Sequence, residues 1–255
     1  YNVSILDKEA VLALAEKLEI DGIMSFAVDP GVTTAAYVAE ELNLPSVGSY
    51  EAVSLLQNKG LFRKFLEQHN FNVPKSETYT SKSAAINGLK TFDLPVIVKP
   101  VDSAGSKGVM KVSCEADIEK AIDYAFSNSF SKTFIIEDFL EAKTFSSDSD
   151  CFSIDGNLNF VSFSNQRFDS KSPNPYTPSA YSWPSSISEN NQNYLKAELQ
   201  RLISLLKLKS SIYNIEVREA ANGKAYIMEV SPRGGGNRLS EMLKLSTGTD
   251  LIVLS

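Results

Sequence analysis

Residues 95–109 read PVIVKPVDSAGSKGV. The run from Val96 to Val98 predicts a short buried strand that ends at Lys99 and Pro100. The small residues that follow predict a loop that closes at Gly108. Because glycines and serines let backbone N–H groups turn toward an anion, and a lysine adds a fixed charge, this loop suits a lid over the phosphates of a nucleotide. A plain hairpin between two strands fits the same stretch equally well.

Several classes of protein are excluded by what the chain lacks. No GxxxxGK[ST] string occurs, and no GxGxxG follows a predicted strand, so neither common phosphate-binding fingerprint is present. The single histidine argues against a histidine-based triad or zinc site, and the two cysteines lack metal-ligand spacing, which favours free thiols in a reducing cytoplasm.

The composition is that of an ordinary globular protein. With 255 residues, 43% hydrophobic and 22% charged, the chain can form a packed core in two or three small units. Its net charge of -6 argues against binding nucleic acid or an anionic membrane. No apolar run approaches the roughly 20 residues that a membrane helix needs. We therefore expect no nucleic-acid or membrane partner.

The first 45 residues alternate in predicted type. Asp7 can cap a helix over residues 8–20, residues 20–30 read as a strand ending in a Pro-Gly turn, and residues 32–44 read as a second helix. This order is half of a doubly wound α/β unit without its opening strand. Since the chain also starts at Tyr1, we expect a fragment of a longer protein.

The middle of the chain predicts two helices and a strand that leaves its sheet. Residues 50–70 read as one or two helices on which Lys59, Arg63 and Lys64 are expected to face solvent for the most part. Residues 133–142, TFIIEDFLEA, begin as an apolar strand and continue into acids. Such a strand offers free backbone N–H and C=O groups, which an adenine edge needs, although a strand that simply ends in solvated acids reads the same way.

The segments after this strand are less uniform. Residues 148–163 alternate as two strands around Asp155-Gly156, and residues 189–208 form the longest predicted helix. Between them, residues 164–188 are rich in serine and proline and predict either a substrate-facing loop or a linker.

A pair of glutamates stands on a predicted hairpin. Residues 211–230 form two alternating runs joined at Asn222-Gly223, and a two-residue type I′ turn there puts Glu216 opposite Glu229. Like charges across a ladder are destabilising by up to about 1 kcal/mol, so a fold that keeps both should supply a cation between them. Two carboxylates suit Mg²⁺ shared with nucleotide phosphates, whereas two solvated glutamates are the plain alternative.

The same turn assigns the other residues of the hairpin to its two faces. The acidic face would also carry Asn214, Arg218 and Ser231, and the apolar face would carry Tyr213, Ile215, Val217, Tyr226, Met228 and Val230. Just beyond Glu229, the run SPRGGGN places Arg233, three glycines and Asn237 beside the carboxylates. An arginine there suits a bidentate grip on phosphoryl or carboxylate oxygens.

Five short motifs, taken in their order along the chain, resemble those of the ATP-grasp superfamily. They are NK, VIVKP with SAGSKGV, IIEDFLE, IEV and MEVSPRGGGN. The resemblance is to the branch with biotin carboxylase, the carbamoyl phosphate synthetase large subunit and the carboxylate-amine ligases. It runs from about Asn58 to the C-terminus. It implies an α/β (α+β) fold: part of a Rossmann-like domain over residues 1–74, a small ATP-grasp subdomain over 75–139, and a large subdomain over 140–255 that is truncated at its C-terminus.

The resemblance also implies a role for each matching residue. Binding of ATP would fall to Lys59, Lys99, Ser103, Gly105, Ser106, Gly108, Glu137, Asp138, Phe139 and Leu140; binding of Mg²⁺ or Mn²⁺ to Glu216 and Glu229; and catalysis to Arg233 and Asn237. Two positions depart from the family pattern. Ser231 stands where the family usually has an asparagine that binds metal, and no ribose-binding glutamate aligns, so that Asp148 or Asp150 could substitute for it.

The implied activity is that of a cytoplasmic ATP-dependent ligase. It would activate a small carboxylate as an acyl phosphate for capture by an amine, and a homodimer is compatible with it. A second hypothesis is a carboxylase or carbamoyl-phosphate type of enzyme that uses bicarbonate. The basic residues Arg167 and Lys171 are compatible with it. A non-catalytic ATP-binding fragment is a third. The sequence does not name the acid or the amine.

Overall fold

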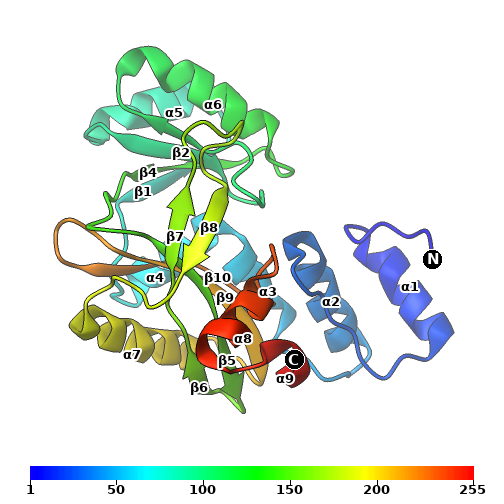
Figure 1. The fold of residues 1–255 in the computed structure, drawn as a ribbon. Helices are drawn as coiled ribbons and strands as arrows, with labels where there is room; N and C mark the ends of the chain where they lie inside the picture. Colours follow the sequence, from blue (N-terminus) through cyan, green and yellow to red (C-terminus); the bar gives the residue numbers. More distant parts are fainter.

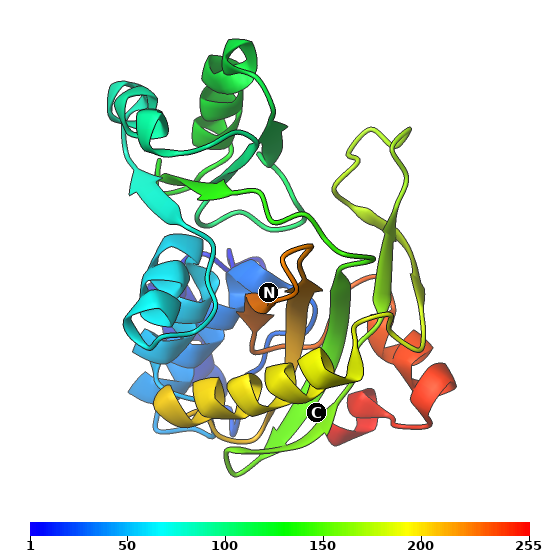
Figure 2. The same ribbon diagram turned by 90° about the vertical axis from the view of Figure 1, so that its left-hand side faces the viewer.

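The computed structural model describes all 255 residues, and Figures 1 and 2 show two sheet-containing subdomains with a helical N-terminal segment beside the larger one. The fold is thus the mixed α/β class that the sequence predicts, and both main sheets are antiparallel. No helix is long and apolar enough to cross a membrane.

The small subdomain is one sheet covered on one side by helices. Its strand order is β1 (Ser76–Tyr79), β4 (Phe134–Asp138), β2 (Val96–Pro100) and β3 (Met110–Val112). Helices α5 (Lys82–Gly88) and α6 (Ile118–Ser127) pack on this sheet, with short 3₁₀ turns at Leu89–Thr91 and Glu115–Asp117. Val96 and Val98 are fully buried, whereas Ile97 and Lys99, which alternate with them, are partly exposed, so β2 has one face toward the core and one face toward the other subdomain.

The large subdomain has a second sheet of four strands. Their order is β10 (Ala225–Ser231), β9 (Ser211–Glu219), β5 (Ser147–Ile154) and β6 (Asn157–Val161). Helices α3 (Tyr50–Gln57), α4 (Lys59–Gln68) and α7 (Glu189–Leu205) cover one face and share a core of 19 buried residues with it. The short helices α8 (Leu239–Thr247) and α9 (Leu251–Leu254) follow the last strand, and α8 packs against β5.

The predicted strand over residues 20–30 is wrong. Residues 20–28 form an irregular segment between α1 (Lys8–Leu18) and α2 (Asp29–Glu41), and Pro30 lies in the first turn of α2. Proline is favoured there because the first helical N–H groups need no partner inside the helix. No strand lies within residues 1–74, so the predicted Rossmann-like unit is not confirmed.

Residues 164–188 hold secondary structure that their composition did not predict. Strands β7 (Asn165–Phe168) and β8 (Pro178–Ser182) form a separate antiparallel ribbon that extends toward the small subdomain (Figure 2). The tip of this ribbon contacts the lid loop: the Ser106 hydroxyl donates to the Tyr176 carbonyl at 3.1 Å, and the Lys111 N–H donates to the Tyr176 hydroxyl at 3.0 Å. The segment therefore spans the cleft between the subdomains.

The hairpin of β9 and β10 differs from the prediction in its turn. The N–H of Ala220 donates to the carbonyl of Lys224 at 2.9 Å, so three residues rather than two connect the strands. The pairing is then one residue out of the predicted register until a bulge at Met228 restores it. Consequently Glu216 does pair with Glu229, whereas Tyr226 and Met228 lie outside the main core, which instead contains Ala225 and Ile227.

Candidate nucleotide and metal site

A cleft of about 520 Å³ separates the two subdomains and is lined by both. It collects eleven of the residues predicted to form the site, namely Lys59, Lys99, Ser103, Gly105, Ser106, Glu137, Phe139, Glu216, Glu229, Arg233 and Asn237. Gly108, Asp138 and Leu140 lie outside its lining. These residues are spread over most of the chain, so the fold assembles one polar cleft from segments that the sequence shows only separately.

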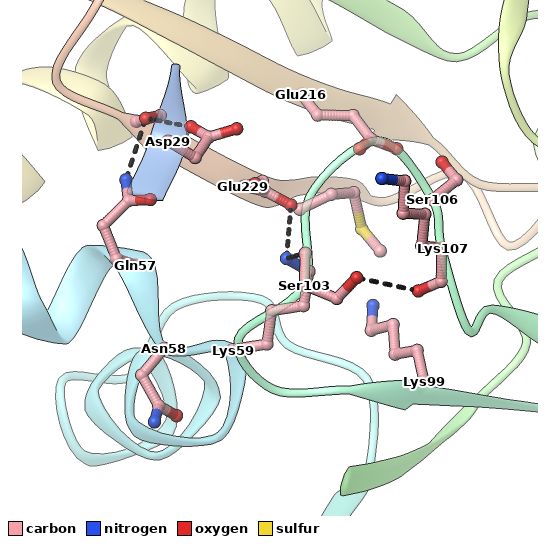
Figure 3. A network of polar contacts seen from close by, with 12 residues as sticks. Asp29, Gln57, Asn58, Lys59, Lys99, Ser103, Ser106, Lys107, Glu216 and Glu229 are labelled. Atoms are coloured by element: carbon pink, nitrogen blue, oxygen red, sulfur yellow. Dashed lines mark hydrogen bonds and ion pairs between the residues drawn. The ribbon is translucent and has the colours of Figure 1, made fainter. Parts of the chain in front are cut away.

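The two glutamates lie side by side beneath cationic side chains. Glu216 and Glu229 are cross-strand partners, and both face the cleft. The Lys59 amine lies 3.1 Å from a Glu229 carboxylate oxygen (Figure 3), and the Arg218 guanidinium lies 3.8 Å from Glu216. The cation that the like-charged pair requires is therefore supplied in part by the protein itself.

Lys59 is placed by both subdomains. It is the first residue of α4, which Asn58 caps through hydrogen bonds from the N–H groups of Gly60 and Leu61. Its own N–H donates to the Val101 carbonyl at 2.9 Å, and its amine donates to the Ser103 carbonyl at 3.3 Å. Burial by itself would lower the pKa of Lys59, but the carboxylates of Glu229, Asp29 and Glu216 together more than offset this and raise it, so the amine stays charged.

Lys99 belongs to a buried group of three charges. Its amine contacts one oxygen of Glu137, and the Arg63 Nε donates to the other at 2.9 Å. The side chains of Arg63 and Glu137 are only 2% and 3% exposed, so the predicted solvent-facing position of Arg63 is wrong. Burial opposes the charged carboxylate, yet Arg63 and Lys99 lower the pKa of Glu137 to about 2. Burial lowers the pKa of Lys99, and Glu137 only partly reverses this.

The Lys59 and Lys99 amines enter the cleft below the loop of residues 103–108 (Figure 3). The Ser103 hydroxyl donates to the Lys107 carbonyl at 3.0 Å and closes this loop on itself. Gly108 has φ +77, and a Cβ there would lie 2.6 Å from Pro100 and 2.8 Å from Asn128, so only glycine fits. The loop thus has the geometry of a lid, and its Lys107 is a cleft residue that the prediction did not single out.

The strand end at residues 138–140 leaves particular backbone groups free. The N–H groups of Asp138 and Phe139 donate to Lys75 and Pro95 at 2.9 and 3.2 Å, whereas no acceptor lies within reach of the Leu140 N–H. The Leu140 carbonyl accepts from Arg218 at 2.7 Å. A free N–H at a bend between two subdomains can serve one edge of a planar heterocycle.

Arg233 does not stand free in the cleft. Its Nε and Nη2 donate to the two carboxylate oxygens of Asp29 at 2.7 and 2.8 Å. The Ser231 hydroxyl also donates to Asp29, at 2.7 Å, and accepts from Gln57 at 2.8 Å. The hydroxyl that replaces the usual asparagine is thus occupied by neighbouring side chains, which leaves Glu216 and Glu229 as the carboxylates of the candidate metal site.

The first two glycines after Arg233 pack against their surroundings, whereas the third, Gly236, has open space beside it and lines the cleft. A Cβ at Gly234 would lie 2.5 Å from Phe26, and one at Gly235 would lie 2.4 Å from Leu239. The N–H of Gly235 donates to Asp150 at 2.9 Å. Asp150 is fully buried and serves this structural contact, so it does not reach the cleft to substitute for a ribose-binding acid.

Asp148 is the third acid of the same sheet row. It pairs with Glu216 on the opposite side from Glu229, lines the cleft, and accepts from Asn214 at 2.7 Å and from Tyr181 at 2.9 Å. Burial, together with the charge of Glu216, raises the pKa of Asp148 to about 7. Three adjacent acids and the lysines opposite them make this cleft strongly polar.

A comparison with known families matches residues 92–241 to the ATP-grasp domain. The chain belongs to this family. The carbamoyl phosphate synthase large chain of Thermoanaerobacter sp. (strain X514) is 25% identical over 256 residues, which are 97% of this chain and 22% of that protein. The chain therefore spans about a fifth of the length of this relative.

Solved structures of this family share the fold over nearly the whole ATP-grasp chain. An L-amino acid ligase from Bacillus licheniformis has a TM-score of 0.77 at 24% identity, covering 96% of this chain and 58% of that one. A biotin carboxylase from Campylobacter jejuni has a TM-score of 0.78 at 19% identity, covering 97% and 56%. The predicted ATP-grasp fold is thereby confirmed.

The cleft also contains residues that the sequence reasoning missed. Asp29, Lys107, Gln166 and Tyr181 line it, and Arg63 supports it from below. Arg63 gave one usable signal, since it lies next to Phe62 and three residues before Leu66 on the buried stripe of α4. Asp29 gave none, because its partner Arg233 is 204 positions away.

Proposed function

We propose that this chain is the ATP-binding part of a ligase that activates a small carboxylate as an acyl phosphate for attack by an amine. The observation that carries the proposal is the cross-strand pair Glu216 and Glu229, which faces the same cleft as Lys59 and Lys99. We propose the subdomain boundaries near residues 75 and 139, because β1 to β4 lie between them. Helices α3 and α4 would belong to the large subdomain, whose core they share.

The donor set of the cleft fits ATP with Mg²⁺. Its two adjacent carboxylates are hard oxygen donors, and no histidine or cysteine lies in the cleft lining to favour a softer metal. Bound at Glu216 and Glu229, Mg²⁺ or Mn²⁺ would neutralise phosphate charge during transfer. Lys59 and Lys99 would bind phosphate oxygens, and the lid of residues 103–108 would exclude water.

The remaining residues would position the adenine of ATP and the carboxylate substrate. The free N–H of Leu140 lies just outside the cleft lining, next to Phe139, which is part of it, and this N–H would bind the adenine edge at the rim. Glu137 would act through Lys99, which it holds in the cleft. Arg233 and Asn237, which also line the cleft, would receive the oxygens of the carboxylate or of its acyl phosphate.

The similarity to carbamoyl phosphate synthase and biotin carboxylase supports a second candidate, in which bicarbonate is the acid. The basic residues that this reading needs are not turned into the cleft. Arg167 stacks on the Phe145 ring at 4.2 Å, and neither Arg167 nor Lys171 lines the cleft. A small organic carboxylate is therefore the better supported substrate.

The test is ADP release from MgATP by the chain in the presence of carboxylates, amines and bicarbonate. Glu229→Gln should lower the rate by at least about 100-fold with the fold intact, because even outer partners of a bound metal are worth about 10–100-fold. The exposed Glu67→Gln is the matched control. Near-native ADP release by Glu229→Gln would remove the metal assignment, and release only with bicarbonate would favour the second candidate. Binding of ATP without any release would indicate a non-catalytic module.

A further inference from the structure

We infer that Asp29 is a positioning residue, which turns the free edge of the Arg233 guanidinium toward the substrate end of the cleft. The inference rests on the proposed function and deepens it. Asp29 lies in α2, outside residues 92–241 that match the ATP-grasp domain, so a second part of the chain would complete the site.

The hydrogen bonds of Arg233 leave one pair of donors free. A guanidinium has five N–H groups. Nε and Nη2 each use one on Asp29, and Nη1 uses one on the Gly234 carbonyl at 2.9 Å. One N–H on each terminal nitrogen therefore remains. These two N–H groups can donate to the oxygens of a carboxylate or a phosphoryl group.

Both carboxylate oxygens of Asp29 bind Arg233, and Asp29 borders the cleft beside that arginine. One of its oxygens accepts from Arg233 Nε and from the Ser231 hydroxyl, each at 2.7 Å, and the other accepts from Arg233 Nη2. Burial would raise the pKa of Asp29, but the hydrogen bonds and charge of Arg233 hold it below its ordinary value. Asp29 is consequently a charged anchor for Arg233, and we expect it to act on a substrate through that arginine.

Three elements hold this anchor in place. Asp29 is the first residue of α2, Gln57 is the last residue of α3, and Ser231 is the last residue of β10. The Gln57 amide donates to the Ser231 hydroxyl at 2.8 Å, and that hydroxyl donates to Asp29 at 2.7 Å. The Arg233 side chain is only 9% exposed. An arginine held at this many points loses little further side-chain freedom when it binds an anion, which favours affinity.

The experiment compares the native chain with Asp29→Asn and with Asp21→Asn, an exposed aspartate that serves as the control. Nitrogen-15 NMR follows the Arg233 Nε–H, assigned through Arg233→Lys. Titration with Mg²⁺ and a non-hydrolysable ATP analogue gives nucleotide affinity. Steady-state ADP release with the carboxylate found in the screen gives kcat and KM.

We expect Asp29→Asn to lose the slowly exchanging Arg233 Nε–H signal. Its nucleotide affinity should stay within about 2-fold of native, while KM for the carboxylate rises by about 10-fold or more, the effect of losing a hydrogen bond to a charged group. Should this variant fail to fold, Ser231→Ala keeps the ion pair and removes its second anchor. That variant should show faster Nε–H exchange and a rise in KM of about 3-fold.

Two results would overturn the inference. One is a folded Asp29→Asn variant with native kcat and KM, which would show that the Asp29–Arg233 ion pair only links α2 to the end of β10. The other is an unchanged Arg233 Nε–H signal in that variant. If the native chain neither binds the ATP analogue nor releases ADP, the proposed function fails, and the NMR comparison alone then decides whether Asp29 orients Arg233.

Discussion

Replacing Glu137 by glutamine removes the single carboxylate between two buried cations. Arg63 and Lys99 both contact it, and neither has another acidic partner within ion-pair distance. Removal of one member of a buried ion pair costs about 3–5 kcal/mol, because the remaining charge has no compensation. The pKa of Glu137 leads to a similar figure. A shift from 4.5 to about 2 corresponds to about 3 kcal/mol of stabilisation of the charged carboxylate.

The dependence on pH distinguishes this mechanism from a simple loss of packing. Because the folded-state pKa of Glu137 lies below the unfolded value, its stabilisation is fully present above about pH 4.5 and is lost as the pH falls toward 2. We therefore expect Glu137→Gln to be about 3–5 kcal/mol less stable than the native chain at pH 7, with a gap that narrows below pH 4.

Urea unfolding at a series of pH values measures both effects. Glu119→Gln is the control, because its ion pair with Lys82 lies on the surface and the Glu119 side chain is 70% exposed, so the change should stay within about 0.5 kcal/mol. The double variant Glu137→Gln with Arg63→Met should recover part of the loss, since one uncompensated charge is gone. A loss below about 1 kcal/mol at pH 7, or a gap independent of pH, would refute the assignment of Glu137 as a charged support for Lys99.

Two further changes test the cleft from its other side. Asp148→Asn should be more stable than the native chain at pH 8 by about 4 kcal/mol in metal-free buffer. The difference should be small at pH 4, because a carboxyl whose pKa rises from 3.8 to about 7 on folding loses its contribution to stability as the pH rises from 3.8 to 7. Urea unfolding checks this, and a stability difference that does not vary with pH would contradict it. Tyr176→Phe removes the hydroxyl that accepts from the Lys111 N–H. Hydrogen exchange at Lys111 and in residues 103–108 should therefore become faster by about 5-fold. The free energy of unfolding should fall by about 1 kcal/mol or less. Unchanged exchange in the lid would show that the β7–β8 ribbon does not restrain it.

Much of the local structure follows from residue patterns. The buried run before Lys99 forms β2, the N-caps Asp7 and Asn58 begin helices α1 and α4, and the apolar spacing of residues 189–205 gives the longest helix. Each depends on interactions within a few positions of the chain, which a sequence displays directly.

The errors share a different cause. Residues 20–30 have strand-forming composition but no neighbouring strand to supply hydrogen bonds, whereas β7 and β8 are polar and form because they pair with each other. The bulge at Met228 moved Tyr226 and Met228 to the other face of the hairpin, and no residue type at that point signals a bulge.

The sequence by itself determined that this chain presents a lysine before a flexible loop and two glutamates that meet across a hairpin. Only the tertiary structure decided which charges those groups face. Arg63 meets Glu137 from 74 positions away, and Asp29 meets Arg233 from 204. Such partners are selected by where whole helices and strands pack, because the energy of a charge depends on its burial and its neighbours in space and not on its neighbours along the chain.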